Sequence, residues 1–281
     1  MRLRIRHHTV YRYAEAVSFG PHHLMLRPRE GHERVIESSR LLVSPAHTLR
    51  WRSDAYGNSV AIADFSTPSE VLQVESEVVV RQLVSNPFDF LLDPHAVSFP
   101  FSYDAGERAD LEPCLEPLYP DEAEIVRDWL DAAAPAPPVE TLAFLDALNQ
   151  AMRRDFQYQR REEPGVQTPA ETIAKRSGSC RDYATLFLEA CRQAGLAARF
   201  VSGYVYNPNH DHGSTHAWAE VYLPGAGWKG YDPTAGLLAC EIHVPVAVAR
   251  HPAAAAPVAG VFYGPGRCLG MDVTVQVKEV A

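Results

Sequence analysis

Cys180 occupies the point where the sequence pattern changes from loop to helix, and this position constrains the fold more than any other feature. Small and apolar residues follow it at three- and four-residue steps, namely Tyr183, Ala184, Phe187, Ala190 and Cys191. That spacing predicts a helix over residues 180–194, with one buried face and the thiol in its first turn. The free amide groups and the positive dipole end of a helix stabilise a thiolate, which a nucleophile requires. On position alone, a buried inert cysteine is the alternative.

A second pattern, at residues 216–234, predicts a histidine and an aspartate close together. The segment has the pattern of two strands around a Pro-Gly-Ala-Gly turn, with His216 opening the first strand and Asp232 closing the second. The required register pairs Tyr222 with Trp228. His216 then lies diagonal to Asp232 on one face of the sheet, within roughly 7 to 8 Å. A slip of one residue would separate the two side chains.

Four sequence blocks follow one another in a fixed order. They are Gly178-x-Cys180-x-Asp182-x-Ala184 with Leu186-Phe187, then Ala198-Arg199-x-Val201-Ser202-Gly203-Tyr204, then His216-Ala217-Trp218-x-Glu220-Val221-Tyr222, then Gly227-Trp228 with Asp232-Pro233-Thr234. Together they resemble the transglutaminase-like core of bacterial proteins, over residues 140–281. The resemblance implies a layout similar to papain-type thiol enzymes. It also implies a catalytic triad on Cys180, His216 and Asp232.

Composition excludes several other classes of protein. The 281 residues are 46% hydrophobic and 22% charged, without an apolar run long enough to cross a bilayer. The first eight residues lack a signal-peptide stretch, so we expect a cytoplasmic protein with no membrane partner. A net charge of −9 argues against a nucleic-acid partner. Five cysteines without paired spacing predict no disulfide framework.

Residues 1–85 have the pattern of an antiparallel β domain, either a sandwich or a barrel-like sheet. Short alternating runs are separated by turn signals such as the one at residues 54–58. Two motifs in this segment, Arg4-Ile5-Arg6-His7-x-Thr9-x-Tyr11-x-Tyr13 and Asp54-x-x-Gly57-Asn58, resemble the N-terminal domain that often precedes the transglutaminase-like core. Four histidines in this segment lack shared acidic ligands, so a metal site there is not favoured: His7, His8, His22 and His23.

The remaining chain predicts a linker followed by a mixed core. Residues 86–120 contain six prolines, which predict an irregular linker. Helical patterns begin at Asp121 and Val139, and a capping-box pattern at Thr168 starts a short helix. A final strand is expected over 272–280. The predicted class is α+β: an N-terminal domain over 1–85, the linker, and a papain-like core over 121–281 with helices packed on an antiparallel sheet.

The expected chemistry is acyl transfer from an amide, peptide or isopeptide bond of a peptide or protein, including a glutamine- or asparagine-type carboxamide. Cys180 attacks the carbonyl, His216 moves the proton and Asp232 fixes the imidazole. The Cys180 backbone N–H is the first candidate oxyanion donor. We name Tyr158 and Gln159 as candidates for the second oxyanion donor, and expect Trp218 and Trp228 to line the site. No cofactor and no metal is called for.

Two other functions remain open at this point. His210, Asp211, His212 and His216 have the composition of a zinc site, which would make the protein a zinc-dependent hydrolase. A catalytically inactive peptide-binding module is the other alternative. In the resembled proteins a Gly-Arg-Asp-Tyr-like piece usually follows the strand near residue 248, whereas this chain has Ala249-Arg250-His251-Pro252. The sequence decides neither between water and an amine as acceptor nor the oligomeric state.

Overall fold

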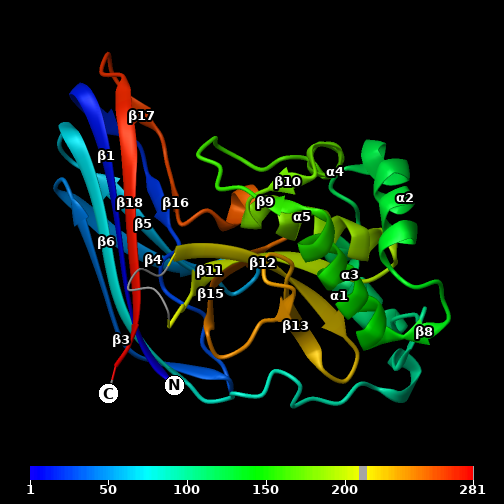
Figure 1. Cartoon of the computed structure of the whole chain (residues 1–281). Helices are drawn as coiled ribbons and strands as arrows, with labels where there is room; N and C mark the ends of the chain where they lie inside the picture. Colours follow the sequence, from blue (N-terminus) through cyan, green and yellow to red (C-terminus); the bar gives the residue numbers. More distant parts are fainter. Residues whose placement is uncertain (209–213, 281) are drawn as a thin grey trace.

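The computed structural model describes residues 1–208 and 214–280 and shows two packed modules (Figure 1). One consists of β-sheets, and in the other helices cover one face of an antiparallel sheet. The predicted α+β class is therefore confirmed. Within the described residues, no helix is both long enough and apolar enough to cross a membrane.

The N-terminal module is a sandwich of two sheets. In the first, β1 (Arg2–Phe19) lies between β6 (Ser69–Gln82) and β18 (Cys268–Glu279), and β3 (Arg34–Ser44) pairs with β6. In the second, β5 (Ser59–Phe65) lies between β2 (His22–Leu24) and β4 (His47–Ser53), and β16 (Val258–Ala259) pairs with β2. A short strand, β17 (Phe262–Tyr263), pairs with the end of β1. Alternating apolar residues fill the space between the sheets, as expected for strands with one buried face.

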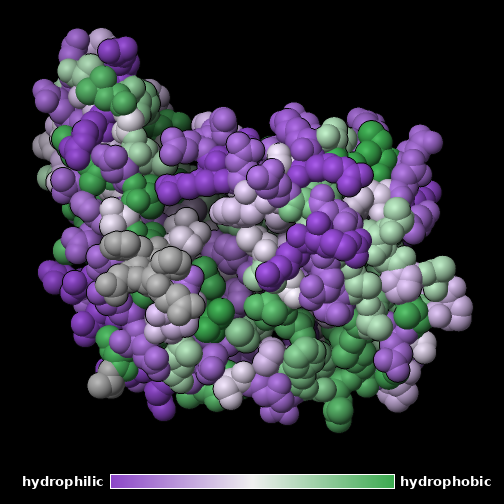
Figure 2. Space-filling model, viewed as in Figure 1, coloured by the Kyte–Doolittle hydropathy of each residue, from purple (hydrophilic) through white to green (hydrophobic). Residues whose placement is uncertain are grey.

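The last strand belongs to this N-terminal module, which corrects the division predicted from the sequence. Residues 121–281 were expected to form one core, yet β18 pairs with β1 from Leu3 opposite Glu279 to Tyr13 opposite Cys268. A strand with alternating apolar residues can form backbone hydrogen bonds with any open sheet edge, so its sequence alone does not show which strand it pairs with. The tip of these strands extends beyond the core, and exposed apolar side chains gather there (Figures 1 and 2): Phe262, Tyr263, Leu269 and Met271.

The segment predicted as an irregular linker contains a helix, α1 (Ala105–Leu115). Asp104 caps it by accepting a hydrogen bond from the Glu107 N–H at 2.8 Å. Pro113 lies in the last turn, so the helix ends two residues after it. The prediction failed because it weighed the number of prolines and not their positions.

The core sheet has the strand order β14 (Leu237–Leu238), β13 (Gly227–Asp232), β12 (Ser214–Leu223), β11 (Ala198–Val205) and β15 (His243–Ala249). Its helices are α2 (Ala123–Ala133), α3 (Thr141–Asp155), α4 (Pro169–Lys175) and α5 (Cys180–Gln193). Two-residue strands pair β7 (Ser98–Phe99) with β8 (Val139–Glu140), and β9 (Gln157–Tyr158) with β10 (Ser177–Gly178). Helix α5 packs on the inner face of β12, whose Ala217 and Ala219 allow close approach. The core sheet also packs on the N-terminal module, through Tyr204, Val244 and Val246.

Asn58 is one of the buried side chains that connect the N-terminal module to β15. Its Nδ2 donates to the Val248 carbonyl at 2.7 Å, and its Oδ1 accepts from the Val248 N–H at 2.9 Å. Asp54 accepts a further bond from Nδ2 at 2.7 Å, and the intervening turn places Gly57 at φ +72°. The side chain therefore takes the place of a neighbouring strand at the edge of the core sheet.

Asn58→Ala should lower the free energy of unfolding by about 2 to 4 kcal/mol, because it leaves both polar backbone groups of a buried residue without partners. Urea denaturation at pH 7.5 measures the change. Asn86→Ala removes the same side chain at an exposed position and serves as the control. Equal stability of the two variants would contradict the structural role of Asn58.

A second prediction concerns His7, which is buried between the modules. Its Nδ1 bonds to the Tyr204 hydroxyl at 2.8 Å and its Nε2 to the Thr9 hydroxyl at 2.9 Å. Burial, with a smaller effect of His8, lowers the pKa of His7 to about 4. The unfolded chain, with a histidine pKa of about 6.5, binds more protons between these values, so stability should fall as the pH drops from 6.5 to 4.

His7→Gln should reduce this slope in urea unfolding measured between pH 7.5 and 4.5, and His8→Gln should not. Some slope should remain in the variant, because burial also lowers the pKa of His22. An unchanged slope in His7→Gln would show that His7 is not the group that responds to acid.

Candidate active site

Helix α5 begins at Cys180, as predicted, and leaves the thiol half-exposed. The residue before it, Ser179, caps the helix: its N–H and its hydroxyl both donate to the Asp182 carboxylate, at 2.8 and 2.7 Å. Cys180 is therefore the first helical residue, where the backbone N–H has no acceptor within the helix.

Asp182 lies beneath this helix start and is fully buried. Besides Ser179, its carboxylate accepts hydrogen bonds from the Gln167 N–H at 2.7 Å and from the Arg161 guanidinium at 2.8 and 3.0 Å. Asp182 therefore ties the loop over residues 161–167 to the turn that carries Cys180.

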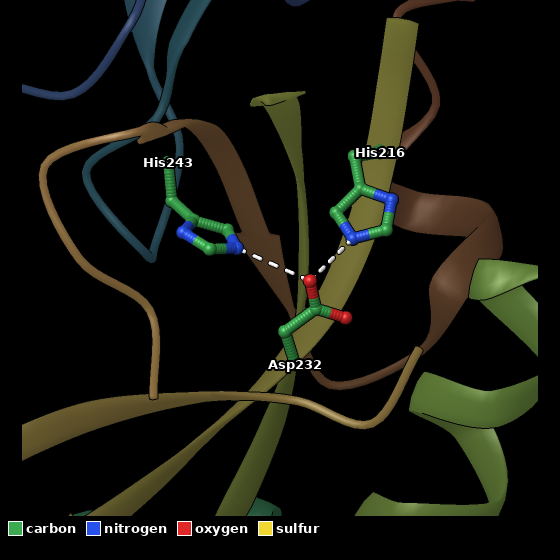
Figure 3. A group of neighbouring side chains, drawn as sticks. All are labelled: His216, Asp232 and His243. Atoms are coloured by element: carbon green, nitrogen blue, oxygen red, sulfur yellow. Dashed lines mark hydrogen bonds and ion pairs between the residues drawn. The ribbon is translucent and has the colours of Figure 1, made fainter. Parts of the chain in front are cut away.

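The predicted strand register is confirmed, since Tyr222 pairs with Trp228. His216 Nε2 lies 2.8 Å from Asp232 Oδ2 (Figure 3). The other carboxylate oxygen, Oδ1, accepts from the backbone N–H groups of Thr234 and Ala235 at 3.0 and 3.4 Å. Both oxygens of this buried carboxylate are therefore bonded.

Cys180 lies close enough to His216 for its thiol to raise the pKa of the imidazole. Since Asp232 occupies Nε2, Nδ1 is the ring nitrogen left to pair with the thiol. Burial lowers the pKa of His216, but the bonds with Asp232 and Cys180 outweigh it and raise the pKa to about 10. Burial likewise raises the pKa of Asp232, and the bonds from the histidines hold it well below the ordinary range. The surroundings favour an ionised aspartate beside an imidazolium.

Sequence reasoning missed His243, the first residue of β15. Its Nε2 lies 3.2 Å from the same oxygen, Asp232 Oδ2 (Figure 3). The sequence indicated a strand near residue 248 but gave no sign that His243, at the start of this strand, lies beside the end of β13. Burial lowers the pKa of His243, but its bonds with Asp232 and Cys240 raise the pKa by more. The net effect is a pKa above the ordinary histidine value.

The two residues predicted as oxyanion donors, Tyr158 and Gln159, lie close to the start of α5. Tyr158 lies half-exposed on β9, where it pairs with Gly178 of β10. Burial and the charge of Cys180 raise the pKa of its phenol. Gln159 is exposed, and its backbone N–H donates to the Gly178 carbonyl at 2.8 Å. Both candidates therefore lie on the segment beside the helix start.

The expectation that two tryptophans line the site needs correction. Trp218 is 1% exposed and packs against the rings of His216 and His243, so it supports them from within the protein. Trp228 contacts Tyr222 and the Arg199 guanidinium instead, at the far end of β13. Strand alternation predicted the shared face correctly, but it did not show that this face is covered by the N-terminal module.

Comparison with known proteins agrees with this geometry. Residues 3–81 match the family described as the bacterial transglutaminase-like N-terminal region, and residues 132–233 match the transglutaminase-like superfamily. The chain belongs to the bacterial transglutaminase-like proteins. The resemblance drawn from the sequence blocks is thereby confirmed.

Individual relatives extend over the whole chain. An uncharacterized protein of Mycobacterium tuberculosis is 29% identical over 292 residues, which cover 98% of this chain and 92% of that protein. The crystal structure of a "putative cysteine protease" from Cytophaga hutchinsonii superimposes with a TM-score of 0.74 at 18% identity, covering 100% of this chain and 92% of that one. A protein-glutamine gamma-glutamyltransferase of Pseudomonas aeruginosa is 37% identical over 67 residues, or 21% of this chain and 10% of that protein.

The three side chains in Figure 3 have the composition of a metal site, with ligand atoms within 4.8 Å of one another. Their hydrogen bonds fit a metal poorly. The Cys240 N–H donates to His243 Nδ1 at 3.2 Å, so the ring proton lies on Nε2 and leaves that nitrogen no lone pair for a metal. The zinc alternative from the sequence rests on His210 and His212, which lie outside the described residues.

Asp182→Asn should lower the free energy of unfolding by about 3 kcal/mol, since it removes the buried counter-charge of Arg161 and leaves only the exposed Glu163, 3.6 Å away. Urea denaturation measures the loss. Asp146→Asn, the same change at an exposed position of α3, is the matched control and should change stability little. A small effect at both positions would mean that the Asp182 contacts do not hold the helix start.

Proposed function

We propose that this protein is a thiol-dependent acyl-transfer enzyme with Cys180 as nucleophile, His216 as acid and base, and Asp232 as the group that orients the imidazole. One observation carries the proposal: a single imidazole bonds to a buried carboxylate and interacts with the thiol at the start of α5. This is the arrangement that activates a cysteine. The raised pKa of His216 supports it, because the imidazolium stabilises the thiolate.

Before the first step the thiol proton has passed to His216, and the Cys180 thiolate then forms a bond to the substrate carbonyl carbon. The electrons of the carbonyl double bond move to its oxygen. When the tetrahedral intermediate collapses, the carbon–nitrogen bond breaks and His216 returns its proton to the leaving amine. The resulting thioester is then attacked by water or by another amine, with His216 again taking the proton. Asp232 stays ionised throughout.

Two donors are suited to the developing oxyanion. The Cys180 backbone N–H is free of helix bonding at the first position of α5. We assign the second role to the Tyr158 hydroxyl in preference to Gln159, because Tyr158 interacts electrostatically with Cys180. Burial and the Cys180 charge both raise the pKa of Tyr158, which keeps its proton available for donation.

The substrate class we propose is a peptide or protein that offers a glutamine- or asparagine-type carboxamide, a peptide bond or an isopeptide bond. The fold shared with a protein named as a cysteine protease supports cleavage. The relative named as a protein-glutamine gamma-glutamyltransferase supports the carboxamide and an amine acceptor. A cytoplasmic location stays a prediction from the sequence.

Iodoacetamide at pH 6.5 should alkylate Cys180 at least about tenfold faster than the exposed Cys268, since Cys180, unlike Cys268, has an imidazole partner. Peptide mass spectrometry of the full chain measures both rates in one sample. His216→Ala should abolish the difference and leave the Cys268 rate unchanged. Buried Cys114 and Cys191 should remain unmodified, which reports that the protein stays folded.

The same samples, incubated with a glutamine-containing peptide library, should form a Cys180 thioester in the native protein and none in Cys180→Ala. Equal alkylation of Cys180 and Cys268 in the native chain would contradict the proposal and favour an inactive peptide-binding module. Activity that survives Cys180→Ala and is lost with a chelator would favour the zinc-dependent alternative.

A further inference from the structure

We infer that His243 is a positioning residue that holds the Asp232 carboxylate in the orientation His216 needs. The inference rests on the proposed function and assigns a role to a residue outside the Cys, His, Asp triad. His243 and His216 approach the same oxygen, Asp232 Oδ2, at 3.2 and 2.8 Å from different strands (Figure 3). The two rings lie 6.2 Å apart between centroids.

The direction of the His243 bond follows from its other nitrogen. The Cys240 backbone N–H can only donate, and it points to His243 Nδ1 at 3.2 Å. Nδ1 is therefore an acceptor, and Nε2 carries the proton that it donates to Asp232. The bond has this direction whenever Cys240 keeps its place in the loop before β15.

The carboxylate cannot turn without losing bonds on both sides. Backbone N–H groups of Thr234 and Ala235 hold Oδ1, and the two histidines hold Oδ2. Without His243, only one side chain would fix the second oxygen. The Asp232 carboxylate could then rotate into the space that His243 leaves. The His216 ring bonded to it would be less well aimed at Cys180.

His243 is itself held by both modules. Its ring packs edge-on against Trp218, with centroids 5.3 Å apart. Its backbone carbonyl accepts a hydrogen bond at 3.0 Å from Gln82, which ends strand β6 of the N-terminal sandwich. A residue only 2% exposed and fixed at ring and backbone has the rigidity that a positioning role requires.

The charged and titratable groups around His243 come from several elements. Asp232 and His216 face it from the core sheet, Cys180 lies beyond His216, and Cys240 and Glu241 precede it in the loop. A pocket of about 200 Å³ adjoins the ring and is also lined by Glu33, Arg34, Glu220 and Lys229.

Two variants of the full chain separate hydrogen bonding from packing. His243→Gln retains an N–H donor at a similar distance from the backbone, whereas His243→Leu fills similar space without one. The Leu variant should alkylate Cys180 at least about tenfold more slowly at pH 6.5, with its rate rising only at more alkaline pH. The Gln variant should recover the rate to within about threefold of the native protein. Cys268 alkylation is the internal reference.

A packing role alone predicts the reverse order, with Leu equal to or better than Gln, and that result would overturn the inference. Nitrogen NMR of the histidine rings in the native protein gives a second test that needs no variant. The inference requires a proton on His243 Nε2, and a ring protonated on Nδ1 alone would contradict it. Failure of the proposed function would be recognised separately, because native Cys180 would then react no faster than Cys268.

Discussion

The Asp232 carboxylate is a buried charge, and the arrangement of the core sheet around it follows from the need to compensate that charge. A carboxylate 2% exposed is costly unless each oxygen accepts hydrogen bonds. Two bonds come from the turn immediately after β13, so the turn that ends the strand also donates hydrogen bonds to the carboxylate. The other two come from the first residues of β15 and the early part of β12. The site therefore exists only when three strands are correctly aligned.

That alignment explains what the β-sandwich contributes to the transglutaminase-like core. The N-terminal module bonds to β15 along its length: Gln82 to the His243 carbonyl, the Arg29 N–H to the Pro245 carbonyl at 2.9 Å, and Asn58 to both backbone groups of Val248. Strand β15 lies at the edge of the core sheet and pairs only with β11 there. An edge strand held on one side can shift, and these contacts supply the other side.

The sequence predicted those parts of the site that depend on local pattern. Helical spacing after Cys180 and the capping residues around it locate the start of α5, and the turn between β12 and β13 fixes the register that joins His216 to Asp232. Contacts between distant segments were not accessible in this way. His243 reaches Asp232 only because β15 pairs with β11, and β18 joins β1 from the other end of the chain. A single alternating strand carries no information about its partner.

The return of β18 to the N-terminal sheet also affects how the two modules can move. The chain crosses between them after β6 and again after β15, so separation would have to stretch two connections. It would also expose the apolar interface formed by Leu3, Ile5, Val244, Val246, Val275 and Val277. Interfaces that are small and polar permit hinge motion, whereas this one is apolar and doubly tethered. The modules should therefore act as one body, which keeps β15 and the shared carboxylate in fixed relation to the thiol at the start of α5.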